Sequence, residues 1–131
     1  MTDNPIVTSS TTGVFTAKVQ NQRDFSASRL NVFFDGETFH ISGQEGDPTT
    51  PDDHYRTIYI HVKKNGDNLT FHKLFYIVKE GPHTEKISAD DGTFTINFDE
   101  ASRHYRMSFH VLAKLPDKTV DILGSFDLRQ S

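Results

Sequence analysis

The 131-residue sequence contains no cysteine. This absence excludes disulfide bonds, thiolate metal sites and cysteine nucleophiles together. A chain of this length can bury a sizeable core without covalent cross-links, so its stability does not require them. Tryptophan is absent too, which makes the usual aromatic platform of carbohydrate-binding domains less expected, although it does not exclude one.

Long apolar runs and a basic surplus are also missing. No apolar stretch approaches the roughly 18 residues that a transmembrane helix needs. Residues 1–12 have neither a basic start nor an apolar core, so we expect a flexible lead-in rather than a signal peptide. The formal net charge of -4 argues against a nucleic-acid partner, which usually requires a clustered basic face. We therefore expect a cytoplasmic protein, with signal-independent secretion as the alternative.

Catalytic and cofactor motifs are lacking as well. The sequence has no G-x-S-x-G elbow, no P-loop, no G-x-G-x-x-G and no H-E-x-x-H. A nucleophile, a base and an orienting acid could still assemble from distant strands. We nevertheless expect a non-catalytic protein without a cofactor.

What the sequence does contain is alternation of inward apolar residues with mostly polar ones in three segments within residues 93–128. A period of two gives one buried face and one wet face, as in the antiparallel sheets of sandwiches and barrels. A four-residue loop at residues 100–103 and a turn at residues 115–118 bring apolar positions opposite one another throughout. That register sets Phe109 opposite Gly124, so that a large ring faces a residue without a side chain.

Turn signals recur at short intervals along the rest of the chain, as an all-β fold requires. Asp35-Gly36 suits a two-residue type I′ turn, which would set Val32 opposite Phe39. We expect residues 23–28 to be irregular and no long helix anywhere. The sequence therefore predicts an all-β fold, an antiparallel β-sandwich of about eight strands over residues 13–131, with a closed β-barrel as the alternative.

The hairpin of residues 55–79 departs from this clean amphipathicity. One of its faces has an evident core pattern, formed by Ile58, Ile60, Val62, Leu69, Phe71, Phe75 and Ile77. The opposite face, expected to be wet, carries aromatic, aliphatic and histidine side chains: Tyr55, Tyr59, His61, His72, Leu74 and Tyr76. Tyrosine and histidine suit ligand contact, because each combines an apolar body with a hydrogen-bonding end. We predict that this face binds a glycan, a lipid surface or a protein partner.

Three alternatives to a free binding face remain. Another segment of the chain or a second subunit would cover it, because exposed apolar patches usually turn out to be covered. Two copies of the chain would pair through it as a homodimer, which makes self-association the second functional hypothesis. A closed barrel would instead hold a small apolar ligand inside, with the phenylalanine-rich strands as its wall.

Metal sites are suggested by two groups of residues, and neither is convincing. His61 and His72 would be cross-strand neighbours, but no third ligand of matching placement is visible among the seven histidines. Acidic residues in two predicted loops would offer oxygen ligands to calcium, namely Glu45, Asp47, Asp52, Asp53, Asp90 and Asp91. Turns require such Asp-Gly and Asp-Pro pairs in any case, so we favour solvated loops and expect no bound metal.

The outer face of the predicted three-stranded unit at residues 93–128 carries two polar cross-strand rows. One row consists of Asn97, Arg106 and Asp127, and the other of Thr95, Ser108 and Ser125. A flat polar row of this kind would suit a sugar, but ordinary solvated strands have the same composition. We favour the solvated interpretation for both rows.

Overall fold

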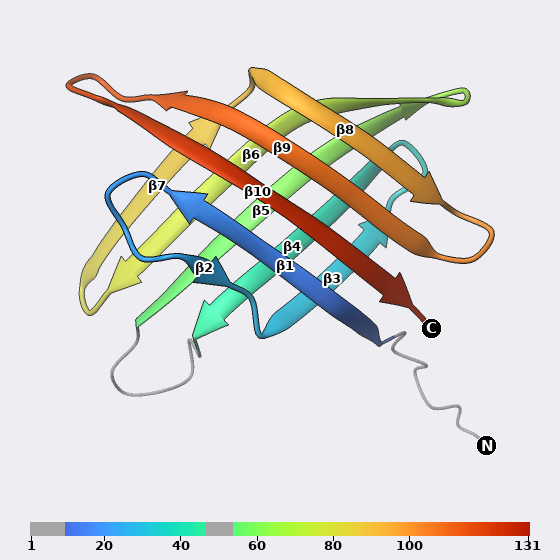
Figure 1. Cartoon of the computed structure of the whole chain (residues 1–131), viewed down its shortest axis with the longest axis horizontal. Coiled ribbons are helices and arrows are strands. Elements are labelled where there is room, and N and C mark those ends of the chain that lie inside the picture. Colours follow the sequence, from blue (N-terminus) through green and yellow to red (C-terminus); the bar gives the residue numbers. More distant parts are fainter. Residues whose placement is uncertain (1–9, 47–53) are drawn as a thin grey trace.

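The computed structural model describes residues 10–46 and 54–131, which form two antiparallel sheets of five strands each (Figure 1). Sheet A has the strand order β2-β1-β10-β9-β8, and sheet B has the order β3-β4-β5-β6-β7. The strands are β1 (Thr11–Val19), β2 (Phe25–Ser26), β3 (Arg29–Phe34), β4 (Thr38–Gly46), β5 (His54–Asn65), β6 (Asn68–Glu80), β7 (His83–Ala89), β8 (Gly92–Asp99), β9 (His104–Lys114) and β10 (Thr119–Gln130).

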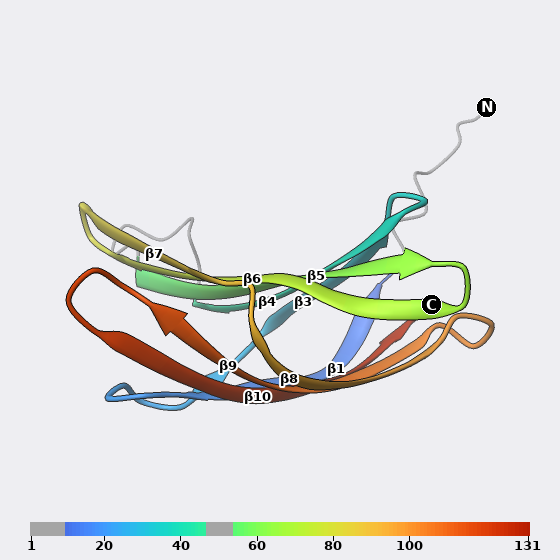
Figure 2. The ribbon, with the colours of Figure 1, turned by 90° about the horizontal axis from the view of Figure 1, so that it is seen from above.

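The two sheets lie face to face as separate layers (Figure 2), and they do not close on each other. The predicted β-sandwich is therefore confirmed, and the alternative of a closed barrel is wrong. The described residues form ten strands rather than about eight, partly because the segment expected to be irregular contains the short strand β2. They contain no helix, and hence none that could cross a membrane. Strand β1 begins at Thr11, inside the predicted lead-in, and residues 1–9 lie outside the described residues.

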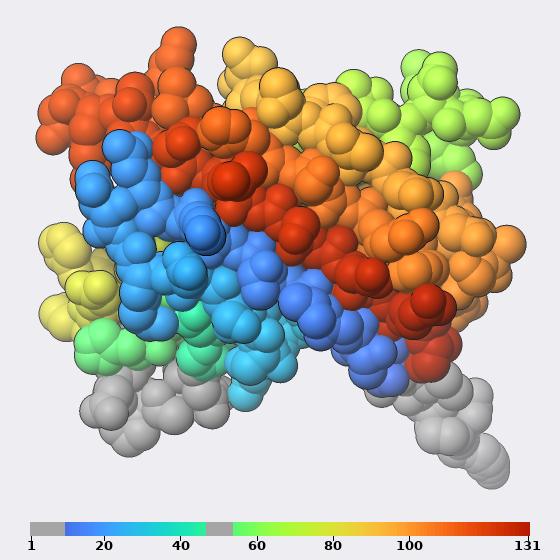
Figure 3. All heavy atoms as spheres, viewed as in Figure 1, coloured from blue at the N-terminus to red at the C-terminus, as the bar shows by residue number. Residues whose placement is uncertain are grey.

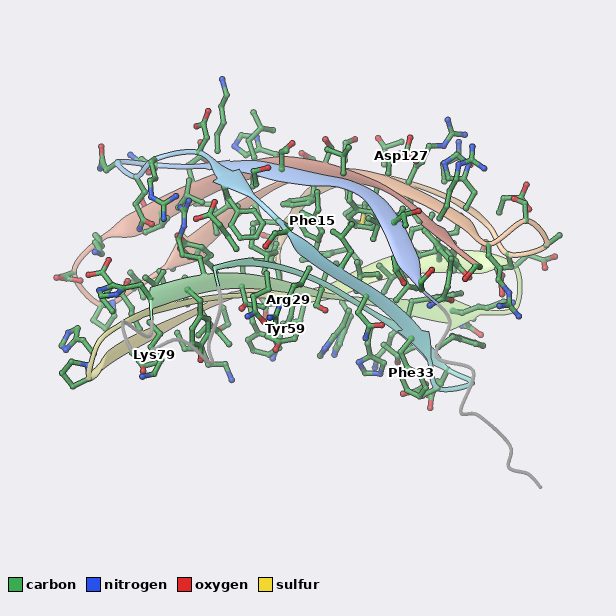
Figure 4. All side chains as sticks on the ribbon, turned by 90° about the horizontal axis from the view of Figure 1, so that it is seen from below. Phe15, Arg29, Phe33, Tyr59, Lys79 and Asp127 are labelled. Carbon is green, nitrogen blue, oxygen red and sulfur yellow. The ribbon has the colours of Figure 1, made fainter. Side chains whose placement is uncertain are left out.

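The core fills the space between the sheets with side chains from the inward positions of the strands. Phe15 of β1 projects into this layer (Figure 4), where it is 1% exposed. Its ring packs against three others, with centroid distances of 5.9 Å to Phe25, 6.3 Å to Phe109 and 5.3 Å to Phe126. Such distances lie within the range of favourable aromatic pairs.

The predicted register of β8, β9 and β10 is confirmed. Phe98 lies opposite Tyr105, and Phe109 lies opposite Gly124. A Cβ atom on Gly124 would come within 2.6 Å of the Phe109 ring and 2.8 Å of the Ala17 Cβ. The glycine therefore provides the space that the opposing ring occupies, as the sequence pattern indicated.

The predicted turn at Asp35-Gly36 is wrong by one residue. Val32 pairs with Ile41, and not with Phe39. The carboxylate of Asp35 accepts hydrogen bonds from the backbone amides of residues 37 and 38, at 2.9 and 2.7 Å. This side chain organises a turn centred on Gly36 and the following residue, so the turn closes one position later than an Asp-Gly type I′ turn would. The pairing shifts by two residues, which keeps the same side chains on the buried face.

The predicted faces of the β5–β6 hairpin are wrong for half of β6. His61 pairs with Lys73, whereas the next residue of β5, Val62, pairs with Phe71. His72 is therefore the extra residue of a β-bulge, which shifts the alternation of β6 by one position. From Leu74 onward, every residue of β6 faces the opposite side from the one that simple alternation predicts.

Candidate functional site

The outer face of sheet B, turned away from sheet A, collects aromatic side chains from four strands. Phe33 of β3 lies opposite His40 of β4, which lies opposite His61 of β5. On the neighbouring cross-strand row, Tyr59 of β5 lies opposite Phe75 of β6. Phe33 and Tyr59 project away from the other sheet, whereas Phe15 lies between the sheets (Figure 4). We call the set Phe33, His40, Tyr59, His61 and Phe75 the aromatic face.

Ring contacts connect four members of the aromatic face, Phe33, His40, His61 and Phe75, across the sheet. The ring centroids lie 5.9 Å apart between Phe33 and His40, 4.7 Å between His40 and His61, and 5.7 Å between His61 and Phe75. The two contacts of His61 are edge-to-face, the geometry that aromatic pairs favour. Phe33 is 57% exposed and Tyr59 is 39% exposed. The rings thus support one another while keeping substantial apolar surface open to solvent.

Cationic side chains surround the aromatic face. Lys73 of β6 and Lys86 of β7 both place their ammonium groups over the Phe75 ring, at 5.6 and 4.4 Å from its centroid. Outward positions of the five strands carry five cations and no carboxylate: Arg29, Lys63, Lys73, Lys79 and Lys86. The strands of sheet B therefore contribute only positive charge to this face, although the whole chain has a formal net charge of -4.

Neutral hydrogen-bonding groups complete the surface. The cross-strand row that contains Tyr59 and Phe75 begins at Asn31 of β3 and Ser42 of β4 and ends at Ser88 of β7. Amide and hydroxyl groups therefore lie on both sides of the two rings. The β3–β4 and β6–β7 turns bend away from sheet A at opposite ends of sheet B (Figures 2 and 4), so this face is concave along that direction.

Histidine chemistry at the aromatic face depends on a local charge network. His40 Nε2 lies 2.9 Å from the carboxylate of Asp35, and this bond, with two backbone amides, lowers the pKa of Asp35 to about 2. Burial lowers the pKa of His61, and the positive charge of neighbouring Lys73 lowers it further, against the opposing effect of Asp35. The imidazole of His61 is therefore neutral in the folded protein at neutral pH.

We expect the free energy of unfolding to decrease as the pH falls below 6.5, in part because of His61. Its folded-state pKa lies below the ordinary value of 6.5, so the unfolded chain takes up this proton first and gains stability relative to the folded state. The variant His61→Gln should show a smaller decrease when urea denaturation is measured at neutral pH and at about pH 5.5. A slope identical to that of the wild type would contradict the assignment to His61.

The structure separates the six side chains predicted for the binding face. Tyr59 and His61 belong to the aromatic face, half-buried Tyr55 lies further along the same side of β5, and His72 is exposed at the bulge. The prediction was wrong for Leu74 and Tyr76, which are 0% exposed in the core. The bulge at His72 is the physical reason, because it turns both residues inward.

Sequence reasoning missed three members of the aromatic face. Phe75 was assigned to the core because the bulge was not recognised, and its true position is half-buried on the outer side. Phe33 and His40 belong to the β3–β4 hairpin, and alternation within one hairpin does not show that it lies beside β5. The adjacent residues Phe33 and Phe34 did contain a signal. Because consecutive strand residues point to opposite faces, one of the two rings had to lie on the outer side of its sheet.

Arg56 forms a polar network at the end of sheet B that the sequence did not reveal. This side chain is 5% exposed, and its guanidinium donates to both carboxylate oxygens of Glu45 at 2.8 to 3.0 Å. It also donates to the backbone carbonyls of Arg23 and Asp24, at 2.9 and 2.8 Å, and to the hydroxyl of Tyr76 at 3.3 Å. The network fastens sheet B to the connection between β1 and β2.

Tyr76 contributes to this network rather than to a ligand site. Its hydroxyl donates a hydrogen bond to the side-chain oxygen of Gln22 and accepts one from Arg56. Burial raises the pKa of the Tyr76 phenol above its ordinary value. The hydroxyl therefore stays protonated and remains available as a donor inside the protein.

The predicted calcium residues do not form a site in the described part of the chain. Within residues 10–46 and 54–131, no group of three or more acidic or histidine side chains could hold a metal ion. Glu45 is bonded to Arg56 and also lies 2.7 Å from Arg23. Asp90 lies between β7 and β8, whereas Asp47, Asp52 and Asp53 lie outside the described residues.

A groove of about 560 Å³ lies where β7 passes to β8, lined partly by Asp90, His110 and Asp121. His110 Nε2 lies 2.6 Å from the carboxylate of Asp121, and both side chains are about half exposed. In the described chain, no hydroxyl group is hydrogen bonded to His110. The pair therefore lacks the activated nucleophile that covalent catalysis requires.

The outer face of sheet A has the polar rows that the sequence predicted. Arg106 lies opposite both Asn97 and Asp127, and Ser108 lies opposite Thr95 and Ser125. This face is drawn in Figure 3, where β1 (blue) and β10 (red) run side by side. Unlike sheet B, its outer side mixes both signs of charge; for example, the carboxylate of Asp127 lies 2.6 Å from His104.

Comparisons of the chain with models of protein families, with curated proteins and with solved structures found no match.

Proposed function

We propose that this chain is a non-catalytic binding module that holds a glycan on the outer face of sheet B. The observation that carries the proposal is the aromatic face, with Phe33 57% and Tyr59 39% exposed. Exposed apolar patches rimmed by polar groups mark interaction sites. Beside the lysines, the rim includes the neutral amide and hydroxyl groups of Asn31, Ser42 and Ser88, which suit the many hydroxyls of a sugar.

The shape of the face favours an extended ligand over a small molecule or a bilayer. Small-molecule sites are clefts that bury most of the ligand surface, whereas the aromatic face lies on an open sheet. A bilayer contacts the protruding parts of a peripheral protein. Tyr59 lies on β5, the central strand of sheet B. The β3–β4 and β6–β7 turns bend outward at opposite ends of this sheet (Figures 2 and 4), so a flat bilayer would contact those turns before it reached Tyr59.

Charge argues against self-association through the same face. A two-fold dimer brings the same patch of each subunit together, so the cations of one copy would approach those of the other. Lys63, Lys73 and Lys86 form no ion pair with any described residue. Like charges placed across an interface are unfavourable, and a dimer of this type would therefore be disfavoured.

We expect Phe33→Ala and Tyr59→Ala each to weaken glycan binding by about tenfold or more, because exposed aromatic anchors dominate binding energies. Both side chains lie outside the core, so the free energy of unfolding should change by no more than about 0.5 kcal/mol. Binding is measured first on a glycan array and then by calorimetry with the best array ligand.

Leu123→Ala is the matched control, because Leu123 is 51% exposed on the outer face of sheet A. Its binding should equal that of the wild type. Full binding by both aromatic variants, or an equal loss in the control, would contradict the proposed site.

A further inference from the structure

We propose that the glycan is acidic, and that Lys73 and Lys86 bind its carboxylate or sulfate group. This inference rests on the proposed function, because it names the chemical class of the ligand for the same face. The reasoning starts from the positions of the two ammonium groups.

Both ammonium groups gather over one ring. Lys73 precedes Phe75 by two residues on β6, and Lys86 approaches the same ring from β7, where it lies opposite Ile77. Their nitrogens lie 5.6 and 4.4 Å from the Phe75 centroid. Cation–π contact of this kind is worth about 0.5–1 kcal/mol at exposed sites. Because both nitrogens contact the same ring, they lie at most about 10 Å apart.

The two positive charges lack compensation in the described part of the chain. Neither Lys73 nor Lys86 forms an ion pair with a described residue, and the outward positions of the five strands of sheet B carry no carboxylate. Like charges this close repel each other. An anion bound beside the two lysines relieves the repulsion, and each ammonium offers it up to three hydrogen-bond donors.

The groups beside this cationic pair are those of a sugar site. Tyr59 and Ser88 both lie opposite Phe75, on the strands to either side. A carboxylate or sulfate held by the two lysines would place the rest of the sugar over the Tyr59 ring, with hydroxyl partners nearby. Further along β5, Lys63 adds a positive charge for a second acidic unit of a repeating polymer.

Other anionic partners fit this surface less well. Lysine is depleted in protein–protein interfaces, which disfavours an acidic protein. Single-stranded nucleic acid requires aromatic faces on which bases stack, but the face of Phe75 is covered by lysine and His61 contacts its neighbours edge-to-face.

The test uses the full chain and an array of uronate and sulfated polysaccharides, each beside its carboxyl-reduced or desulfated form. We expect the wild type to bind acidic forms at least about tenfold more tightly than the matched neutral forms, with an advantage that shrinks as salt is added. The double variant Lys73→Gln/Lys86→Gln should lose this preference while it keeps the weaker binding to neutral forms.

Lys18→Gln/Lys114→Gln removes the same charge from the outer face of sheet A and should keep the preference. Equal binding of acidic and neutral forms by the wild type would overturn this inference and leave the proposed function standing. An unchanged preference in the Lys73/Lys86 variant would overturn it as well. Binding to no glycan, or tighter binding to anionic vesicles or single-stranded oligonucleotides, would overturn both proposals.

Discussion

Replacing Arg56 by alanine is expected to lower the free energy of unfolding by about 3–5 kcal/mol. Arg56 is 5% exposed and holds Glu45 with three hydrogen bonds. Its removal leaves the carboxylate of Glu45 half-buried beside a new void, with only the more exposed Arg23 to pair with. The carbonyls of residues 23 and 24 also lose their donor. Removing one partner of a buried ion pair destabilises the folded state by more than the intact pair stabilises it.

The expected loss is measured by urea denaturation, with Arg106→Ala as the control. Arg106 is exposed on the outer face of sheet A, opposite Asp127, so its removal should cost no more than about 0.5 kcal/mol. The conservative variant Arg56→Lys should fall between the wild type and Arg56→Ala, because an ammonium cannot reproduce the two-pronged guanidinium contact. A loss at Arg56 no larger than that at Arg106 would show that the network does not support the fold.

Phe15→Ala should lower the free energy of unfolding by a similar amount, about 3–5 kcal/mol. The Phe15 ring is 1% exposed and contacts three other aromatic rings in the core. Shortening the side chain leaves a cavity that rigid strands on both sides cannot fill. Because the total free energy of unfolding of a small domain is only about 5–15 kcal/mol, the variant would be close to unfolding at room temperature.

Phe33→Ala is the matched control for this experiment, since it removes the same atoms from a ring that is 57% exposed. This variant should lower the free energy of unfolding by no more than about 0.5 kcal/mol. Comparable losses at the two phenylalanines would mean that Phe33 is covered in solution, and the aromatic face would then not be a free surface. The same variant thus links the stability experiment to the binding experiment.

A second test of Phe15 uses its neighbour in the other sheet. A Cβ atom on Gly43 of β4 would come within 2.7 Å of the Phe15 ring, so Gly43→Ala alone overpacks the core and should destabilise it by about 1–3 kcal/mol. In the background of Phe15→Ala, both ring atoms that this methyl group would meet are absent, so Gly43→Ala should destabilise the protein less. The double-mutant cycle should therefore show a favourable coupling, and simple additivity would contradict direct packing between the two positions.

The contribution of β6 to the aromatic face depends on one irregularity in that strand. With simple alternation, Leu74 and Tyr76 would face solvent and Phe75 would face the core. The bulge at His72 reverses all three. Since side chains alternate strictly along a strand, one inserted residue exchanges the two faces of everything that follows it. Tyr59 and His61 were found from the sequence because β5, unlike β6, continues without interruption.

The sequence by itself determined the all-β class and the register of β8, β9 and β10. Those strands alternate without a break and are joined by short turns, so each pair such as Phe98 and Tyr105 follows from residues close together in the chain. The same local information identified Tyr59 as an outward aromatic residue. It also indicated that Phe109 needs a residue as small as Gly124 opposite it.

Only the tertiary structure decided which side chains from distant segments of the chain meet. Phe33 reaches His61 through His40 because three separate strands lie next to one another in sheet B. Arg56 reaches the carbonyls of residues 23 and 24 across more than thirty residues of chain. Neither a bulge nor a contact between distant segments leaves a periodic signal in the sequence, since periodicity reports only on neighbours within one unbroken strand.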